Sequence, residues 1–182
     1  MMAISVKSLA LFLAAASVLS GQQSNPAQVK AASPASQNAG GDTVPDVYAI
    51  QAHIDRIVVL RLKYDADLLA GIEKMVKQEQ IRNGVILAAI GSLRGYQIDQ
   101  ISNRDFPSKN AMESNPRSPA ELVGMNGYII AGRVHAHITL ATPEKAIAGH
   151  LQYNTRVFTS AIVTIAVTND SNFNRIDDQT YR

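Results

Sequence analysis

The chain has 182 residues, of which 46% are hydrophobic and 18% are charged, and its formal net charge at pH 7 is +2. A chain of this length and hydrophobic content can bury the core of one domain. Its lysines and arginines are scattered along the sequence, which argues against the clustered positive charge that nucleic-acid binding usually needs. Since the chain has no cysteine, it is not a small scaffold stabilised by disulfides.

Residues 1–20 have the pattern of a secretory signal peptide. Lys7 provides a positive charge near the start, residues 9–19 are an apolar run, and residues 18–20 suit signal peptidase. An uncleaved membrane anchor is the weaker alternative, because the apolar run is shorter than the ~20 residues that span a bilayer. We therefore expect cleavage near Gly21, a periplasmic or secreted location, and no stable membrane insertion after cleavage.

Residues 21–46 are expected to be a disordered linker. They consist mostly of Gln, Ser, Asn, Ala, Gly and Pro, and a segment with so few large apolar side chains cannot offset the entropy lost on folding. Such a spacer would separate the folded domain from its neighbours, although a tail without any role explains the composition equally well. The folded domain is expected over residues 47–182.

The folded part begins with apolar residues over residues 48–62, which predict one or two strands with His53 as an ordinary strand histidine. An amphipathic helix is predicted next. Asp65 or Asp67 can cap its start, and Asn83 with Gly84 supplies a left-handed stop. The apolar face of this helix consists of Leu68, Leu69, Ile72, Met75 and Val76.

Residues 85–90 form a continuous apolar run, which predicts a central strand covered on both faces. Gly91 and Ser92 are expected to turn the chain, and the alternation over residues 94–101 predicts a half-exposed strand. Residues 103–119 are rich in Asn, Ser, Pro and charge, so we expect a loop there.

Further strands are predicted over residues 121–130 and 133–141, with a break near Ala131 and Gly132, and over residues 157–167. Helix is therefore a minority component. The pattern predicts an α/β fold of the α+β kind, with a largely antiparallel mixed β-sheet flanked by a few helices.

Three of the four histidines lie in one predicted hairpin. His135 and His137 are two residues apart in a strand, so both side chains leave the same face. If Thr142 faces Lys145 across the turn, the antiparallel register places His150 opposite His137, where Cβ atoms are ~4.5–5.5 Å apart. A slip of one residue in this turn would direct His150 to the other face.

Three neutral imidazoles around an open fourth position suit zinc first, and nickel, cobalt or copper next, because nitrogen ligands match these metals. Gly149 would leave room beside such an ion, since glycine has no Cβ. The alternative is that His135 and His137 are simply polar residues on the wet face of an amphipathic strand. The spacing alone leaves both interpretations open.

The order of the motifs resembles the plants-and-prokaryotes conserved (PPC) domain over about residues 47–182. The matching pieces are Leu60-Arg-Leu-Lys-Tyr-Asp-Ala-Asp-Leu-Leu69, Ile81-Arg-Asn-Gly-Val-Ile-Leu-Ala-Ala-Ile-Gly-Ser-Leu93, the Gly127 strand that leads into His135-Ala-His137, Gly149-His-Leu151, and the ending Asn174-Arg175. Each piece alone is weak, whereas the ordered set is specific.

This resemblance implies a mixed sheet of about seven strands flanked by helices, assembled as a homotrimer. It also implies that His135, His137 and His150 hold a metal, with zinc as the first candidate, as the corresponding histidines of prokaryotic members do. Two positions depart from the family pattern. Ala148 stands where the family often has a second glycine, and Ile162 stands where it often has an acidic residue, which removes one carboxylate partner.

Plant members of the family bind AT-rich DNA through a separate basic arm, the AT-hook, which is built around Arg-Gly-Arg-Pro and enters the minor groove. This sequence contains no such arm. Together with the predicted signal peptide and the small net charge, this argues against a nucleic-acid partner, although the family is often labelled as DNA-binding.

Two functions remain open from the sequence. The first is a metal-dependent hydrolase or lyase, in which the ion would lower the pKa of a bound water toward ~7. The sequence assigns no general acid or base, because Asp99, Glu121 and Glu144 all read as surface residues that nothing places near the ion.

The second function is a binding or sensing module, in which the ion holds a small anionic ligand. Arg94 and Arg133 are the candidates for added positive charge, because the guanidinium fork suits a carboxylate or phosphate. Both arginines are better explained as solvated strand residues. A purely structural zinc is a third interpretation, although three histidines resemble an open site more than a closed one.

Overall fold

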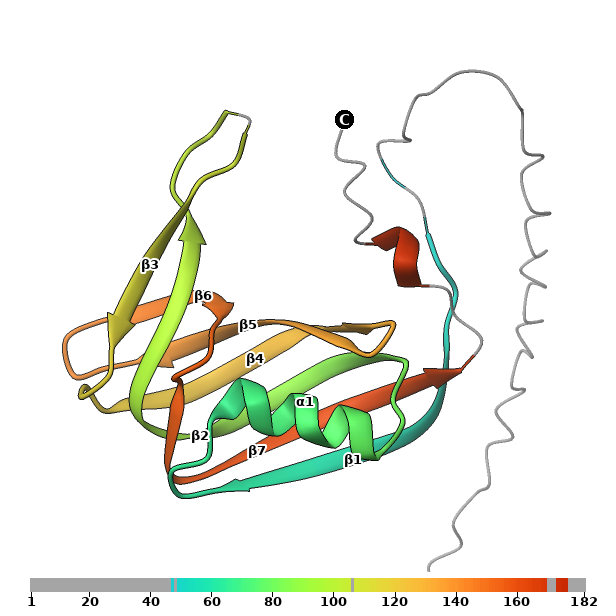
Figure 1. The fold of residues 1–182 in the computed structure, drawn as a ribbon, viewed down its shortest axis with the longest axis horizontal. Helices are drawn as coiled ribbons and strands as arrows, with labels where there is room; N and C mark the ends of the chain where they lie inside the picture. The colour runs from blue at the N-terminus through green and yellow to red at the C-terminus, as the bar shows by residue number, and fades with distance from the viewer. Residues whose placement is uncertain (1–46, 48, 106, 170–172, 177–182) are drawn as a thin grey trace, which may run out of the picture. The chain divides into compact units, whose positions relative to one another are not determined.

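A seven-stranded antiparallel sheet with one short α-helix forms the described part of the chain (Figure 1). The computed structural model describes residues 47, 49–105, 107–169 and 173–176. The predicted signal peptide (residues 1–20) and linker (residues 21–46) lie outside the described residues, so both stay predictions. Among the helices that are described, none is long and apolar enough to cross a membrane.

The strands follow one another along the chain with a single helix after the first. The elements are β1 (His53–Lys63), α1 (Leu68–Gln78), β2 (Asn83–Ile101), β3 (Asn110–Asn115), β4 (Ala120–Ile130), β5 (Arg133–Ala141), β6 (Ala146–Leu151), β7 (Arg156–Asn169) and a 3₁₀ turn, η1 (Phe173–Ile176). In the sheet the order is β1-β7-β2-β4-β5-β6, and β3 pairs with β2. Every pairing between these described strands is antiparallel, which confirms the predicted fold class.

The helix α1 begins where the sequence predicts and ends earlier. Asp67 is its N-cap, with a carboxylate oxygen that accepts a hydrogen bond from the Ala70 N–H at 3.0 Å. The helix stops at Gln78, and Gln80 takes the left-handed conformation with φ 53°. The predicted stop at Asn83 and Gly84 is therefore wrong, because both residues already belong to β2.

One face of the sheet is covered by α1, which lies across β1, β7 and the first half of β2 in Figure 1. The helix buries Leu68, Leu69, Ile72 and Val76 against alternate residues of these strands, such as Leu60 on β1 and Val163 on β7. Gly71 allows the close approach, since a Cβ there would lie 2.5 Å from Leu62 Cδ2. The core therefore lies between α1 and this face of the sheet.

The strand β2 is central, but it is not covered on both faces as predicted. Leu87 remains 50% exposed and Ile90 61% exposed, because α1 covers only the opposite face. The expected turn at Gly91 and Ser92 is also wrong, since β2 continues through both residues. Gly91 serves close packing instead, because a Cβ there would lie 2.5 Å from the carbonyl oxygen of Ser160 on β7.

The predicted loop over residues 103–119 contains a strand. The strand β3 pairs with the second half of β2, from Tyr96 opposite Asn115 to Ile101 opposite Asn110. Its residues are mostly polar and exposed, so the sequence lacks the apolar alternation that usually marks a strand. Its partner, the second half of β2, corresponds to the half-exposed strand that the sequence predicts over residues 94–101.

The break predicted near Ala131 and Gly132 is a two-residue hairpin turn between β4 and β5. Both residues have positive φ, 50° and 80° respectively, which is the conformation that the common primed turns require. Ile130 pairs with Arg133 directly beyond the turn. This tight turn fixes the register that carries the histidines of β5.

Candidate metal centre

His135 and His137 leave the same face of β5. Between and beside them, Ala136 and Ile138 are buried in the core, so the alternation of the strand directs the two imidazoles away from it. The strand β6 follows after a short turn in which the Thr142 N–H donates to the Lys145 carbonyl oxygen at 2.8 Å.

This turn places His137 directly opposite His150, which is the register that the sequence predicts if Thr142 faces Lys145. The ligand nitrogens of His135, His137 and His150 all lie within 4.8 Å of one another. The ring centroids are 5.6 Å apart for His135 and His137, 4.8 Å for His135 and His150, and 5.2 Å for His137 and His150. Three imidazole nitrogens at this spacing fit a borderline divalent metal such as zinc.

The charge state of His137 also suits a metal ligand. Burial is the main cause that lowers the pKa of His137 below its usual value, and the neighbouring His150 and His135 lower it further. Asp99 acts in the opposite direction. Because the neutral imidazole is the form that binds metal, the lowered pKa favours the binding form.

The strand β2 adds a carboxylate that the sequence did not place. Its second half crosses β6 with Asp99 directly opposite His150, and Asn110 Nδ2 donates to Asp99 Oδ2 at 3.0 Å. Gly149 permits this crossing, since a Cβ there would lie 2.6 Å from the Asp99 carbonyl oxygen. Gly149 therefore makes room for the backbone of β2. The sequence had suggested that it makes room for an ion.

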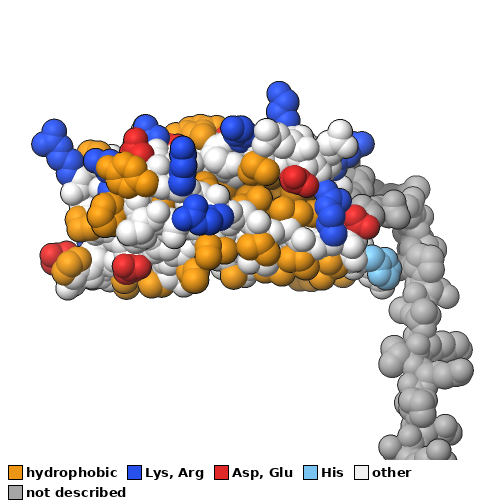
Figure 2. Space-filling model, turned by 90° about the horizontal axis from the view of Figure 1, so that it is seen from below, with side chains coloured by type: hydrophobic (Ala, Val, Ile, Leu, Met, Phe, Trp, Pro, Cys, Tyr) orange, Lys and Arg blue, Asp and Glu red, His pale blue; other side chains and the backbone are white. Residues whose placement is uncertain are grey.

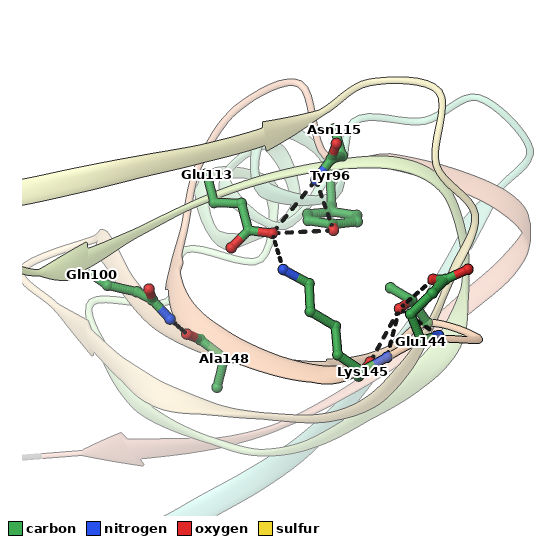
Figure 3. Close-up of polar contacts among 8 residues, drawn as sticks. Tyr96, Gln100, Glu113, Asn115, Glu144, Lys145 and Ala148 are labelled. Atoms are coloured by element: carbon green, nitrogen blue, oxygen red, sulfur yellow. Dashed lines mark hydrogen bonds and ion pairs between the residues drawn. The ribbon is translucent and has the colours of Figure 1, made fainter.

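Polar contacts on either side of the crossing fix β2 and β3 against the histidine hairpin (Figure 3). Gln100 Nε2 donates to the Ala148 carbonyl oxygen at 2.5 Å, and Lys145 Nζ lies 2.9 Å from Glu113 Oε1 on β3. Asn115 Nδ2 donates to the hydroxyl of the buried Tyr96 at 2.9 Å. The position of Asp99 beside the histidines is therefore held by both neighbouring strands.

The three histidines line a cavity of about 1050 Å³. Asp99, Gln100, Ser108, Asn110 and Gln152 form its polar wall together with the histidines. Its apolar lining includes Leu87, Ile90 and Val123, each of which is at least half exposed.

The two arginines proposed from the sequence do not line this cavity. Arg94 lies with its guanidinium carbon 5.2 Å from the ring centroid of Tyr64 and forms an ion pair of 3.4 Å with Asp65. Arg133 lines a separate cavity of about 780 Å³ beside the end of α1. The structure thus brings the three histidines and Asp99 together, whereas neither arginine lies in their cavity; a ligand role for the arginines stays a prediction.

The fourth histidine, His53, lies at the start of β1 and is exposed. It is not among the residues whose ligand atoms converge. It therefore provides a natural control for any experiment on the other three.

The fold and the converging histidines define a small α+β domain with a candidate metal site. The chain belongs to the PPC family, since the model of the Plants and Prokaryotes Conserved domain matches residues 50–169. This confirms the resemblance seen in the ordered motifs.

Solved structures share this fold at low sequence identity. A metal-containing protein from Archaeoglobus fulgidus is 21% identical with a TM-score of 0.59, covering 68% of this chain and 86% of that protein. A PPC protein from Pyrococcus horikoshii is 22% identical with a TM-score of 0.51, covering 70% and 87%. A Bacteroides thetaiotaomicron protein labelled as DNA-binding is 14% identical with a TM-score of 0.52, covering 65% and 83%.

Two curated relatives are bifunctional GlmU proteins from two Synechococcus strains. Each is 25% identical over 127 residues, which is 68% of this chain but only 18% and 19% of the relatives themselves. The chain thus spans less than a fifth of the curated relatives it matches.

Proposed function

We propose that this protein binds a divalent transition metal through His135, His137 and His150, with zinc as the first candidate, and that the ion holds a small molecule. The observation that carries the proposal is the convergence of three ligand nitrogens within 4.8 Å of one another at the wall of a cavity. The metal-containing relative from Archaeoglobus fulgidus supports it.

The number of ligands favours binding over a purely structural role. Structural zinc sites usually have four protein ligands, whereas three histidines leave one position open. Among the described residues no cysteine or carboxylate joins the converging set. A position that the protein does not fill is available to a small molecule from the cavity.

A metal-dependent hydrolase or lyase is the second candidate, and one observation favours it. The carboxylate of Asp99 lines the same cavity as the histidines, and a carboxylate beside a metal site is a common general base. When bound, the ion would supply a water of lowered pKa. Asp99 would then be the residue that orients this water.

The proposal extends to assembly and location. We propose a homotrimer, as the family resemblance implies, and the exposed apolar side chains of β1, β7 and β2 support self-association. Residues 1–20 support export to the periplasm or secretion. We still expect no nucleic-acid partner. The Bacteroides thetaiotaomicron protein labelled as DNA-binding shares only the fold with this chain.

The metal proposal is tested by adding zinc to protein stripped with a chelator and purified without a histidine tag. A ligand that binds only the native state stabilises it, by ~2.7 kcal/mol at a hundred times its Kd. We therefore expect a clear rise in the Tm on addition of zinc, with no rise on addition of magnesium. An unchanged Tm with zinc, nickel, cobalt and copper would refute the proposal.

A further inference from the structure

Charge is distributed unevenly around the histidine cavity. Apart from the histidines, Asp99 is the one ionisable side chain among the described residues that line it, and no lysine or arginine does so. The ion itself would supply the positive charge of the site, and the chain adds one carboxylate acceptor beside it. This favours a ligand that offers Asp99 a hydrogen-bond donor over one that offers only acceptors.

The carboxylate of Asp99 is held in place and has accepting capacity left. It lies opposite His150, where directly paired Cβ atoms are ~4.5–5.5 Å apart. Its Oδ2 accepts from Asn110 Nδ2 at 3.0 Å, and a carboxylate can accept several hydrogen bonds. Since Asp99 lines the cavity but is not in the converging ligand set, its carboxylate is available as an acceptor beside the metal position rather than as a ligand.

Another part of the cavity wall is apolar. Leu87, Ile90 and Val123 line it with 50%, 61% and 54% of their surfaces exposed. Apolar surface of this kind is stabilised when it is removed from water, by about 25 cal/mol for each Å². A ligand that reaches this wall should carry an apolar group.

We propose that Asp99 is a specificity-determining residue, and that the site takes a small uncharged molecule with three features. An oxygen lone pair binds the ion held by the histidines, an adjacent hydroxyl or N–H donates to Asp99, and an apolar group packs against Leu87, Ile90 and Val123. This inference rests on the proposed metal site. It differs from the anionic ligand that the sequence suggested, because a deprotonated carboxylate or phosphate offers Asp99 only acceptors.

A matched pair of probes separates these features. Benzamide is uncharged and carries a carbonyl oxygen beside an N–H donor, whereas benzoate has the same ring and a carboxylate without a donor. Both are titrated into the cobalt-loaded protein, and the cobalt absorption spectrum reports binding. The ratio of benzamide affinity to benzoate affinity is expected to be higher for the wild-type protein than for a variant that lacks the Asp99 carboxylate.

The variant Asp99→Ala is expected to retain its cobalt and to bind benzamide about tenfold more weakly, since hydrogen bonds to charged groups are the stronger ones. Its affinity for benzoate should stay the same or rise, because a repelling charge is gone. Asp55→Ala, on exposed β1, is the matched control and should change the affinity for neither probe. Asn110→Ala keeps the carboxylate but removes its hydrogen-bond donor, and should weaken the binding of benzamide alone by a smaller factor.

Equal losses for both probes in Asp99→Ala would indicate a merely structural role and overturn the inference. So would an unchanged affinity for benzamide in both Asp99→Ala and Asn110→Ala. A wild-type protein that retains no cobalt fails at an earlier step, and that result refutes the metal site itself.

Discussion

Gly127 lies next to the histidines, directly opposite Ala136 across β4 and β5. Its φ is +157°, and a Cβ there would lie 2.1 Å from the carbonyl oxygen of His135. No side chain fits at that distance, so the backbone that carries His135 can keep its position only because residue 127 is a glycine.

Gly127→Ala should therefore destabilise the protein by more than ~1 kcal/mol, because the native backbone is incompatible with the new methyl group. Chemical denaturation measures this change. Gly124→Ala is a matched control on the same strand, because a Cβ there meets nothing within 4 Å. If both variants were equally stable, the close approach at Gly127 would have no energetic consequence.

Among elements, the start of α1 depends on one side chain. One oxygen of Asp67 accepts from the Ala70 N–H at 3.0 Å, and the other accepts from the Asn154 N–H at 2.7 Å. The same carboxylate thus caps the helix and ties it to the segment before β7.

Asp67→Ala should lower the free energy of unfolding by ~1 kcal/mol or more, since an N-cap is lost and a second backbone donor loses its partner. Urea denaturation measures the difference. Lys74→Ala, at an exposed position of the same helix, should be close to neutral. A loss for Lys74→Ala as large as that for Asp67→Ala would show that the cap is not the cause.

The elements also show which features could be predicted from the sequence and which could not. The histidine hairpin could be predicted to within one residue, because the pairing of His137 with His150 follows from strand alternation once Thr142 faces Lys145 across the turn. The position of Asp99 beside the histidines could not be predicted, because it depends on where β2 bends and on which strands β2 pairs with beyond the bend. Such non-local pairing leaves no periodic pattern near Asp99, and β3 was missed for the same reason.

At the scale of the whole molecule, no described residues form a covering layer over one face of the sheet. Ile57 and Val59 on β1, Ile162 on β7 and Ile90 on β2 are all between 41% and 62% exposed. Ile90 and Ile162 are directly paired. Figure 2 shows apolar side chains along much of the surface seen from below, between lysines and arginines. An exposed apolar sheet face of this kind is typical of a protein interface.

A charge on this face should disrupt the proposed trimer. The wild-type protein is expected to have three times the mass of the chain by light scattering, and Ile162→Lys is expected to reduce it to that of a single chain. Met112→Lys is the control, because Met112 is 55% exposed on β3. A wild-type mass equal to one chain would contradict the trimer, and so would an Ile162→Lys variant that remains trimeric with native circular dichroism.

The most direct test of the metal site is the stoichiometry of metal to protein, measured by mass spectrometry of tag-free protein dialysed against zinc. We predict about one zinc ion per chain for the wild type and for His53→Ala, whose histidine lies outside the converging set. His137→Ala should lose most of its zinc, because the two imidazole nitrogens of His135 and His150 alone do not make a stable site. A His137→Ala protein with as much zinc as His53→Ala would contradict the assignment of the three histidines as metal ligands.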